Sequence, residues 1–381
     1  MTTPDSEERR ATGAWVLEGG GAGAPGAASA SASASGEGDL RVTDDAVSFG
    51  PRSVEFLDVD EVRDEERVLS LSLWPSGTVR LSRLARRHET FVRALREARD
   101  RARLAGLLAH GIDAPVSFDG AVREPGPQRP ARLLVYRTHL AVVPAVGDPY
   151  QVPFGSVSGV RHFEPDWDVV VDVEGTKHVF GMLARRTEAF ARTLSEARDA
   201  QGRRLDEATG TPWFADGTPV AVPDAKEFDR LVASFTAPER ADGAGKIVAK
   251  AGRENVRLGL VELLDPDGET LASPKPLPEN TAFFLLARLG ARTLLEILSG
   301  PAAATYIFEA PLDAVARDLR ELHYRRRPLA LTKAEETGPA GRPYRLALRR
   351  LEPLRRLRAA TRARVIHTEG FPEALEKAIS G

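Results

Sequence analysis

Two stretches decide the architecture of this chain: LARRHETFVRALREARD, from Leu84 to Asp100, and LARRTEAFARTLSEARD, from Leu183 to Asp199. They are identical at twelve of seventeen positions without a gap, far more than unrelated segments share, and so indicate a duplicated module. In both copies apolar residues recur at i, i+4 and i+7, starting from Phe91 in the first and Phe190 in the second. This spacing predicts two amphipathic helices whose phenylalanines are buried at matching positions.

The likeness continues upstream of both helices as alternating apolar residues, which predict short strands. The segment 40–49 matches 133–142, and further upstream AWVLEG at 14–19 matches PVSFDG at 115–120 as the expected first strand. A strand, a glycine-containing turn and a second strand then precede each helix. Each module is therefore predicted to be a meander of short strands closed by one helix.

A segment of Gly, Ala and Ser separates the first expected strand of module one from the next. It has no periodicity and no bulky side chain, so 19–38 is predicted to be a disordered loop. Within it, GAGAPG (21–26) imitates a dinucleotide-binding fingerprint. That motif must open an amphipathic helix, and Pro25 with the absence of large apolar residues before Leu40 argues against one.

The whole chain of 381 residues is predicted to be α+β and mostly β. The third region is expected to hold strands at 256–273 and 281–310, a helix at 312–326 and a C-terminal helix. We interpret it as a diverged third module, with an unrelated domain as the alternative. The predicted boundaries are 1–110 for module one, 111–205 for module two, 206–245 for a linker with a short helical patch around 225–235, and 246–381 for the third module with a basic C-terminal segment.

Composition narrows the function classes. There is no cysteine, which excludes disulfide frameworks and thiolate chemistry, and the seven histidines are too scattered to form a local metal pair. We expect a cytoplasmic protein, because the N-terminus has no secretory pattern and no apolar run reaches membrane-spanning length. Rich Arg, Ala, Gly and Pro usage suggests a bacterial source. No catalytic residue, metal ligand, cofactor or small-molecule substrate is predicted, so we expect no enzyme.

Single polar and aromatic residues receive structural interpretations. His88, on a flank of the first repeated helix, is interpreted as a surface residue. The four tryptophans are interpreted as core or rim packing residues rather than stacking platforms. They are Trp15, Trp74, Trp167 and Trp213.

The charge is unevenly distributed. Between Glu321 and Arg364 there are thirteen Lys or Arg against four Glu, a surplus of nine positive charges, whereas the whole chain carries −2. The segment also has an apolar stripe, which Pro353 should interrupt. It either binds anionic lipid or polyanion, or docks on an acidic surface of its own chain. The candidate anion-binding residues are Arg325, Arg326, Arg327, Arg345, Arg349, Arg350, Arg355 and Arg356.

Strands reading L-x-V-x-x-x-x-V/L and V-x-F-x-x-V-x-x-V, then a strand pair and a helix with F-x-x-x-L, resemble pleckstrin-homology-like and GRAM-like modules. The resemblance covers Ala14 to Arg103, Pro115 to about Gly202 and, more weakly, Lys246 to about Arg327. It implies tandem bent antiparallel sheets, each capped by a C-terminal helix, in an adaptor for head groups, peptides or proteins. The first loop of module one lacks the basic residues of lipid-binding members, and module two offers only Arg123, Arg129 and Arg132 as head-group candidates.

The sequence therefore favours a non-enzymatic adaptor or scaffold that binds a protein partner through tandem modules. The alternative is a peripheral binder of anionic membrane lipid or nucleic acid, acting through the arginine-rich C-terminal segment. Localisation is expected to be cytoplasmic, or peripheral at the membrane under the alternative.

Overall fold

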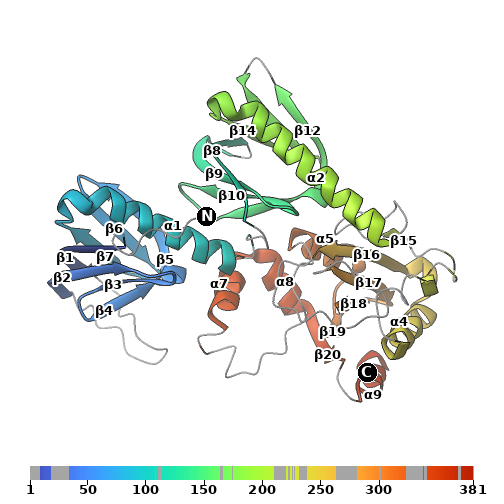
Figure 1. Ribbon diagram of the computed structural model, residues 1–381. Helices are drawn as coiled ribbons and strands as arrows, with labels where there is room; N and C mark the ends of the chain where they lie inside the picture. The colour runs from blue at the N-terminus through green and yellow to red at the C-terminus, as the bar shows by residue number, and fades with distance from the viewer. Residues whose placement is uncertain are drawn as a thin grey trace. The chain divides into compact units, whose positions relative to one another are not determined.

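The computed structural model shows a mixed α+β chain, mostly strand, with curled antiparallel sheets (Figure 1). Contacts divide it into two compact units: 1–110 with 143–150 and 338–346, and the remainder. The residues described are 9–18, 34–107, 109, 114–124, 126–163, 166–173, 175–209, 220–221, 224, 226, 228–230, 238–262, 281–299, 302–322, 338, 341–367 and 370–380.

Module one is a seven-stranded sheet followed by one helix. Its strand order is β4-β3-β2-β1-β7-β6-β5, so the first strand pairs with both the second and the last. That pairing curls the sheet around a single core, which helix α1 (His88–Gly106) covers (Figure 1). The strands are β1 Arg10–Glu18, β2 Ala34–Val42, β3 Ala46–Phe49, β4 Arg52–Glu55, β5 Val59–Glu65, β6 Val68–Leu73 and β7 Thr78–Ser82, with short 3-10 helices η1 Phe56–Asp58 and η2 Ala85–Arg87.

Module two repeats this arrangement. Its order, β11-β10-β9-β8-β14-β13-β12, is that of module one strand for strand, and helix α2 (Thr187–Thr209) follows the last strand. The duplicated topology confirms the repeat read from the two helices. The strands are β8 Val116–Glu124, β9 Arg129–Val135, β10 His139–Pro144, β11 Tyr150–Pro153, β12 Val157–Phe163, β13 Asp168–Val173 and β14 Thr176–Gly181, with 3-10 helices η3 Phe154–Ser156 and η5 Ala184–Arg186.

The apolar helix stripes lie in the cores, as predicted. Phe91 and Phe190 are both fully buried, and Leu95 and Leu194 are buried one turn later. In module two the ring of Phe190 contacts the rings of Phe118 and Phe180 at centroid distances of 5.2 and 5.8 Å. The matching stripes therefore hold each helix on its own sheet.

The first strands match in a different register from the one expected. A Cβ on Gly13 would lie 2.6 Å from the carbonyl oxygen of Ser82, and one on Gly120 would lie 2.9 Å from that of Gly181. Ala14 pairs with Ser82 as Ala121 pairs with Gly181. Gly13 therefore corresponds to Gly120. The predicted match of 14–19 with 115–120 was wrong, because the sequence between β1 and β2 differs in length between the modules and hides the pairing.

Strand β2 begins inside the predicted loop. Residues 34–38 pair with β1, with Gly36 opposite Trp15, so the loop boundary at 38 was wrong, whereas 19–33 lie outside the described residues. A Cβ on Gly36 would approach the Trp15 indole to 2.8 Å. Glycine lets this strand pass over the buried indole, which the composition alone did not reveal.

The third region, from β15 to α9, has a different arrangement. Its six strands follow one another in sequence order, β15-β16-β17-β18-β19-β20, instead of the order shared by the two modules. Helices α4 and α9 pack against one face of this sheet, and α5 and α8 against the other. The strands are β15 Val220–Ala221, β16 Val256–Glu262, β17 Thr281–Leu289, β18 Arg292–Ser299, β19 Ala302–Phe308 and β20 Thr361–Ile366, and the helices α4 Pro238–Ala251, α5 Leu312–Glu321, α7 Arg342–Arg350, α8 Glu352–Ala360 and α9 Phe371–Ser380.

The predicted linker contributes to this third region. Helix α2 extends to Thr209, β15 pairs with β16, and α4 starts at Pro238, all within 206–245. Phe228 is buried in the same core cluster as β16 and β17. The Pro and Gly content of 206–245 concealed one edge strand and one core residue.

Several elements of the third region confirm the sequence pattern. Three strands lie between 281 and 308, α5 buries Val315 and Leu319, and a C-terminal helix ends the chain. Pro353 stands in the first turn of α8, so the basic segment is two helices meeting near Leu351. The second half of the predicted hairpin at 256–273 lies outside the described residues.

Candidate functional site

The predicted anion-binding arginines do not gather in one place. Arg325, Arg326 and Arg327 lie outside the described residues. Arg345 on α7 donates to the carbonyl of Gly338 at 2.9 Å. Arg349 and Arg350 follow on the same helix and also have interactions within the chain.

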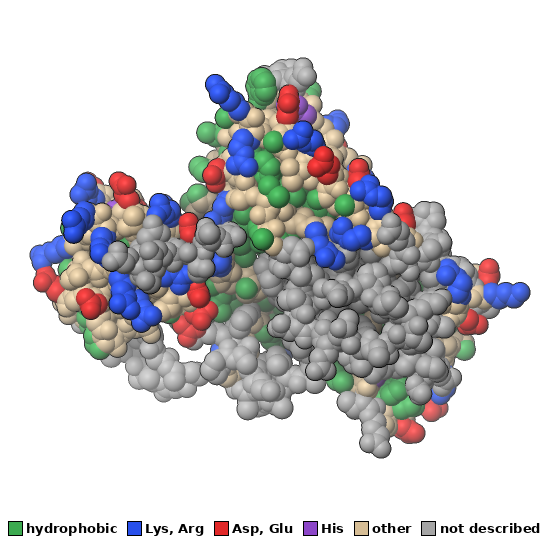
Figure 2. Space-filling model, in the orientation of Figure 1, with side chains coloured by type: hydrophobic (Ala, Val, Ile, Leu, Met, Phe, Trp, Pro, Cys, Tyr) green, Lys and Arg blue, Asp and Glu red, His purple; other side chains and the backbone are tan. Residues whose placement is uncertain are grey.

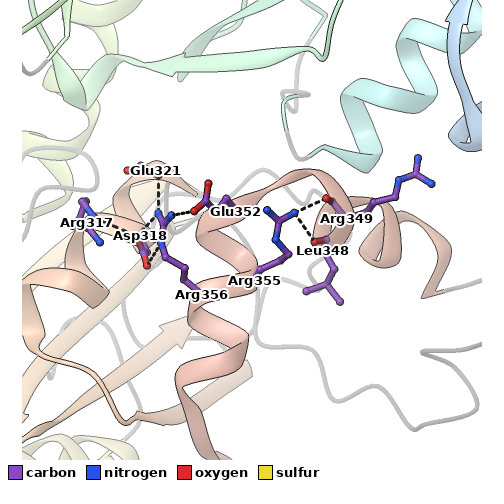
Figure 3. Close-up of polar contacts among 8 residues, drawn as sticks. All are labelled: Arg317, Asp318, Glu321, Leu348, Arg349, Glu352, Arg355 and Arg356. Atoms are coloured by element: carbon purple, nitrogen blue, oxygen red, sulfur yellow. Dashed lines mark hydrogen bonds and ion pairs between the residues drawn. The ribbon is translucent and has the colours of Figure 1, made fainter. Parts of the chain in front are cut away.

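Two arginines at the start of α8 are held by the chain itself (Figure 3). Arg355 donates from its Nη1 to the carbonyls of Leu348 and Arg349, at the C-terminal end of α7. A guanidinium there stabilises the carbonyl oxygens that a helix end leaves without an intrahelical donor. Arg355 therefore fixes the junction between α7 and α8.

Arg356 is bound by carboxylates from two helices (Figure 3). It donates to Asp318 of α5 through Nε at 3.0 Å to Oδ2 and through Nη2 at 2.7 Å to Oδ1. Glu352 and Glu321 lie 2.9 and 3.5 Å away. This two-point contact stabilises the packing of α8 on α5 and neutralises the charge of Arg356.

The pKa values follow from this contact. Burial alone would raise the pKa of Asp318, but hydrogen bonds and charge from Arg356 and Arg317 outweigh burial, and the pKa is lowered. The hydrogen bonds that Arg356 donates to Asp318 raise the pKa of Arg356 above its ordinary range. Both groups are therefore charged at neutral pH. The binding of anions by this segment stays a prediction.

The head-group candidates of module two are spread over its first hairpin. Arg123 on β8 donates to Asp168 of β13 at 2.7 Å, so its charge is paired within the sheet. Arg129 and Arg132 lie on β9, opposite Val122 and Asp119. The structure does not bring the three guanidinium groups together around one position.

Module one has a basic depression that the sequence did not reveal. It is open to solvent, has a volume of about 690 Å³, and is lined by four arginines, Arg10, Arg41, Arg86 and Arg87, over the apolar Ala11 and Leu40. We call it the module-one depression. Arg10 and Arg41 are brought together by the pairing of β1 with β2, which the loop of small residues hides in the sequence.

The repeated LARR tetrapeptide has a structural role in both modules. The second arginine of each copy donates to a carbonyl of the first strand: Arg87 to Arg10 at 3.1 Å, and Arg186 to Ser117 at 3.0 Å. These bonds fasten the 3-10 helix before each long helix to the central strand of its sheet. They give the last arginine of the motif the same role in both copies.

Module two instead exposes aromatic residues. Phe163 ends β12 and is 54% exposed, and Trp167 precedes β13 and is 58% exposed. Hydrophobic side chains are visible at the surface near the top of module two (Figure 2). We call Phe163 and Trp167 the module-two aromatic tip. Trp15 is buried, as predicted for a core residue. Trp167 is more exposed than a residue that packs at the rim of a core. Trp213 lies outside the described residues.

His88 is buried rather than on the surface, so that interpretation was wrong. Its Nε2 lies 2.8 Å from Oδ1 of Asp64 on β5. Helix α1 turns this flank toward the sheet, and a carboxylate there compensates a buried imidazole. In the described part of the chain no three His, Asp or Glu residues converge as metal ligands. No helix in the same part is long and apolar enough to span a bilayer.

Comparison with the models of known protein families finds no match for this chain, and comparison with curated proteins finds none either. The chain's own duplication is therefore the most informative comparison that the molecule offers.

Proposed function

We propose that this chain is a non-enzymatic adaptor whose first two modules are pleckstrin-homology-like and which binds a protein partner through the module-two aromatic tip. Two features support the family likeness: a seven-stranded curled antiparallel sheet, and a single long helix directly after the last strand. In such a closed scaffold the sequence of the hairpins at the ends can vary while the core stays the same.

The exposure of two aromatic residues on one hairpin carries the proposal, and the ring of Trp167 lies 6.1 Å from that of His162. Phe163 and Trp167 flank the turn between β12 and β13, and each exposes more than half of its surface. Large aromatic side chains supply much of the binding energy in protein interfaces, and leaving them in water forgoes that energy. This hairpin is therefore the surface of module two best suited to a partner.

The corresponding hairpin of module one argues that the tip is not a requirement of the fold. Glu65 ends β5 where Phe163 ends β12, and Glu66 and Arg67 form its turn. The same sheet thus forms with charged residues at this place. Aromatic residues in module two then serve something other than closing the hairpin.

The contacts of the C-terminal arginines favour the adaptor over the anionic-surface alternative. Arg356 is already paired with three carboxylates, and Arg355 with two carbonyl groups. A surface that binds anions must first release such partners, which reduces the net gain. The aromatic tip has no comparable obstacle.

Capture from an extract of the native host tests the proposal. The full chain and the variant Phe163→Ser/Trp167→Ser are used as bait, and Trp74→Ser, which removes a 49%-exposed tryptophan from module one, is the matched control. We expect the double variant to lose at least about tenfold of its main captured protein, and the control to retain it. The captured protein is then purified and its affinity for the three baits measured directly.

Salt dependence separates the two functions. Binding through the aromatic tip should change little between low and physiological salt, whereas binding through arginines should weaken steeply. Equal capture by the parent chain and the double variant, or capture abolished by moderate salt, would refute the proposal.

A further inference from the structure

The apolar stripe of helix α1 ends differently from that of helix α2. In module one the stripe runs along the core from Phe91 to Ala102, and its next position, four residues later, is Gly106. Counted without a gap from the paired phenylalanines, the position of Gly106 is held by Leu205 in module two. Module one therefore has no side chain at a position where the periodicity of an amphipathic helix places a large apolar residue.

A leucine from another part of the chain fills that position. A Cβ on Gly106 would lie 2.7 Å from Cδ2 of Leu346 and 3.0 Å from Cδ2 of Leu57. Leu346 lies in α7, is 4% exposed, and belongs to the same compact unit as module one. Only glycine leaves room for this approach, so α7 supplies the apolar side chain that α1 does not carry itself. We call Leu57 and Gly106 the helix-end socket.

The end of α1 is apolar around this socket. Leu104 and Leu107 are each 3% exposed, although they lie beyond the part of α1 that packs in the core of the module. The matching positions of module two hold Arg203, which is exposed, and Asp206. The apolar helix end is therefore a property of module one and not a requirement of the fold that the two modules share.

Polar contacts fix the same helix end independently of Leu346. The side chain of Arg103 is buried and donates from Nη1 to the carbonyl of Asp60 on β5 at 3.0 Å. Its Nη2 pairs with Asp148, in the segment 143–150 of the same compact unit. Removal of the leucine should therefore expose the socket while α1 stays in place.

We propose that the helix-end socket is a binding site for an amphipathic helix with a leucine anchor, and that α7 blocks it in the free chain. The partner helix presents a leucine beside a small residue, as α7 presents Leu346 beside Ala347. Burial of one leucine side chain stabilises the docking of α7 only modestly, although its attachment to the same chain raises its effective concentration. Binding of a partner at the socket therefore depends on the displacement of α7.

A fluorescent peptide of residues 341–351 tests the site on the full chain by anisotropy. The parent chain, in which α7 occupies the socket, should bind the peptide weakly. Leu346→Asp replaces the leucine of the chain by a charged residue, so α7 should leave and the peptide should bind at least about tenfold more tightly than to the parent. A peptide with the same substitution keeps every arginine and should bind neither chain, which separates leucine docking from attraction by charge.

Gly106→Leu fills the socket with the residue of module two. Combined with Leu346→Asp, it should abolish binding of the peptide. Introduced alone, it should release α7, which is measured as faster hydrogen exchange of α7, while α1 is strengthened because leucine favours a helix more than glycine does. Gly202→Leu is the matched control in α2, where an added Cβ meets no described atom within 4 Å outside its own helix. This control should change neither the exchange of α7 nor the binding of the peptide.

Hydrogen exchange of the module-one strands shows whether each variant is folded, and Leu346→Ala takes the place of Leu346→Asp if the latter disturbs them. Equal binding of the peptide to the parent and to the Leu346 variant, or binding to neither, would overturn the proposal. Undiminished binding to the double variant, or unchanged exchange of α7 in Gly106→Leu, would overturn it as well. The aromatic-tip experiment is independent, because none of these variants alters Phe163 or Trp167.

Discussion

Modules one and two have one strand order and one helix position, yet they differ in their side chains at two matching places. Module one has Arg10 and Arg41 where module two has Ser117 and Leu134. Conversely, module two has the exposed Phe163 where module one has Glu65. The two modules therefore share the residues that form their scaffold and differ in residues that the scaffold does not require.

The largest expected effect tests whether the two cores are equivalent. Phe91→Ala and Phe190→Ala should each destabilise their own module by about 3–5 kcal/mol, since both side chains are fully buried. Hydrogen-exchange mass spectrometry of peptides from each sheet separates the two responses, which one unfolding curve of a multidomain chain would merge. A cost below about 1 kcal/mol in one module would break the equivalence.

In the third region an ion pair adds to the apolar packing of helix α8, whereas apolar stripes hold the helices of both modules. Asp318→Ala should destabilise the packing of α8 on α5 by about 1.5–3 kcal/mol, because it removes the two-point contact with Arg356. The pKa of Asp318 is lowered in the folded state, so its contribution is present above the ordinary value of 3.8 and disappears as pH falls through the folded value. Hydrogen exchange of α8 at neutral and acidic pH measures both effects. A parent-to-variant difference that persists in strong acid would contradict the ionic explanation.

The matching glycines give a finer test of the register. Alanine at Gly13 or Gly120 should cost about 1–3 kcal/mol, because each Cβ would meet a backbone carbonyl of the last strand. The cost should be larger at Gly13, where the approach is 2.6 Å rather than 2.9 Å. Gly126→Ala is a useful control with no atom within 4 Å, although its φ of 95° adds backbone strain. Hydrogen exchange of peptides from each module ranks the effects of the three variants, and equal costs at Gly13 and Gly120 would contradict the distance argument.

The smallest expected effect distinguishes the modules by pH. His178 on β14 stands where β7 has the buried Val79, and partial burial lowers the pKa of its imidazole. The unfolded chain therefore takes up the proton first, so module two should lose stability as pH falls below about 6.5. His178→Val should remove that part of the pH dependence. Hydrogen exchange at pH 5.5 and 7.5 detects it as a smaller change in the variant than in the parent.

The sequence predicted the features that depend on local periodicity. The duplicated helices, their buried phenylalanines and the helix break at Pro353 all follow from spacing within one segment. The pairing of two strands across a long connection could not be predicted from such spacing. The approach of Arg10 to Arg41 depends on the register of two strands separated by residues that carry no pattern.

The burial of polar side chains could not be predicted from the sequence either, because it depends on which side chain of another element faces them. His88 has the spacing of a helix flank, and only the position of Asp64 on β5 shows why it is buried. Arg356 belongs to a basic run in the sequence, yet a carboxylate 38 residues away determines its contacts. A charge count could indicate where cations are abundant, but could not separate paired cations from those of the depression.

The contribution of β15 and Phe228 has a practical consequence for dissecting the molecule. A fragment that starts at residue 246, the boundary predicted from the sequence, would lack the strand that covers the edge of β16 and an aromatic side chain from the core. Uncovered strand edges recruit strands from other molecules, and a missing ring leaves a cavity. Such a fragment should aggregate, whereas one that begins shortly before Val220 should express as a soluble monomer.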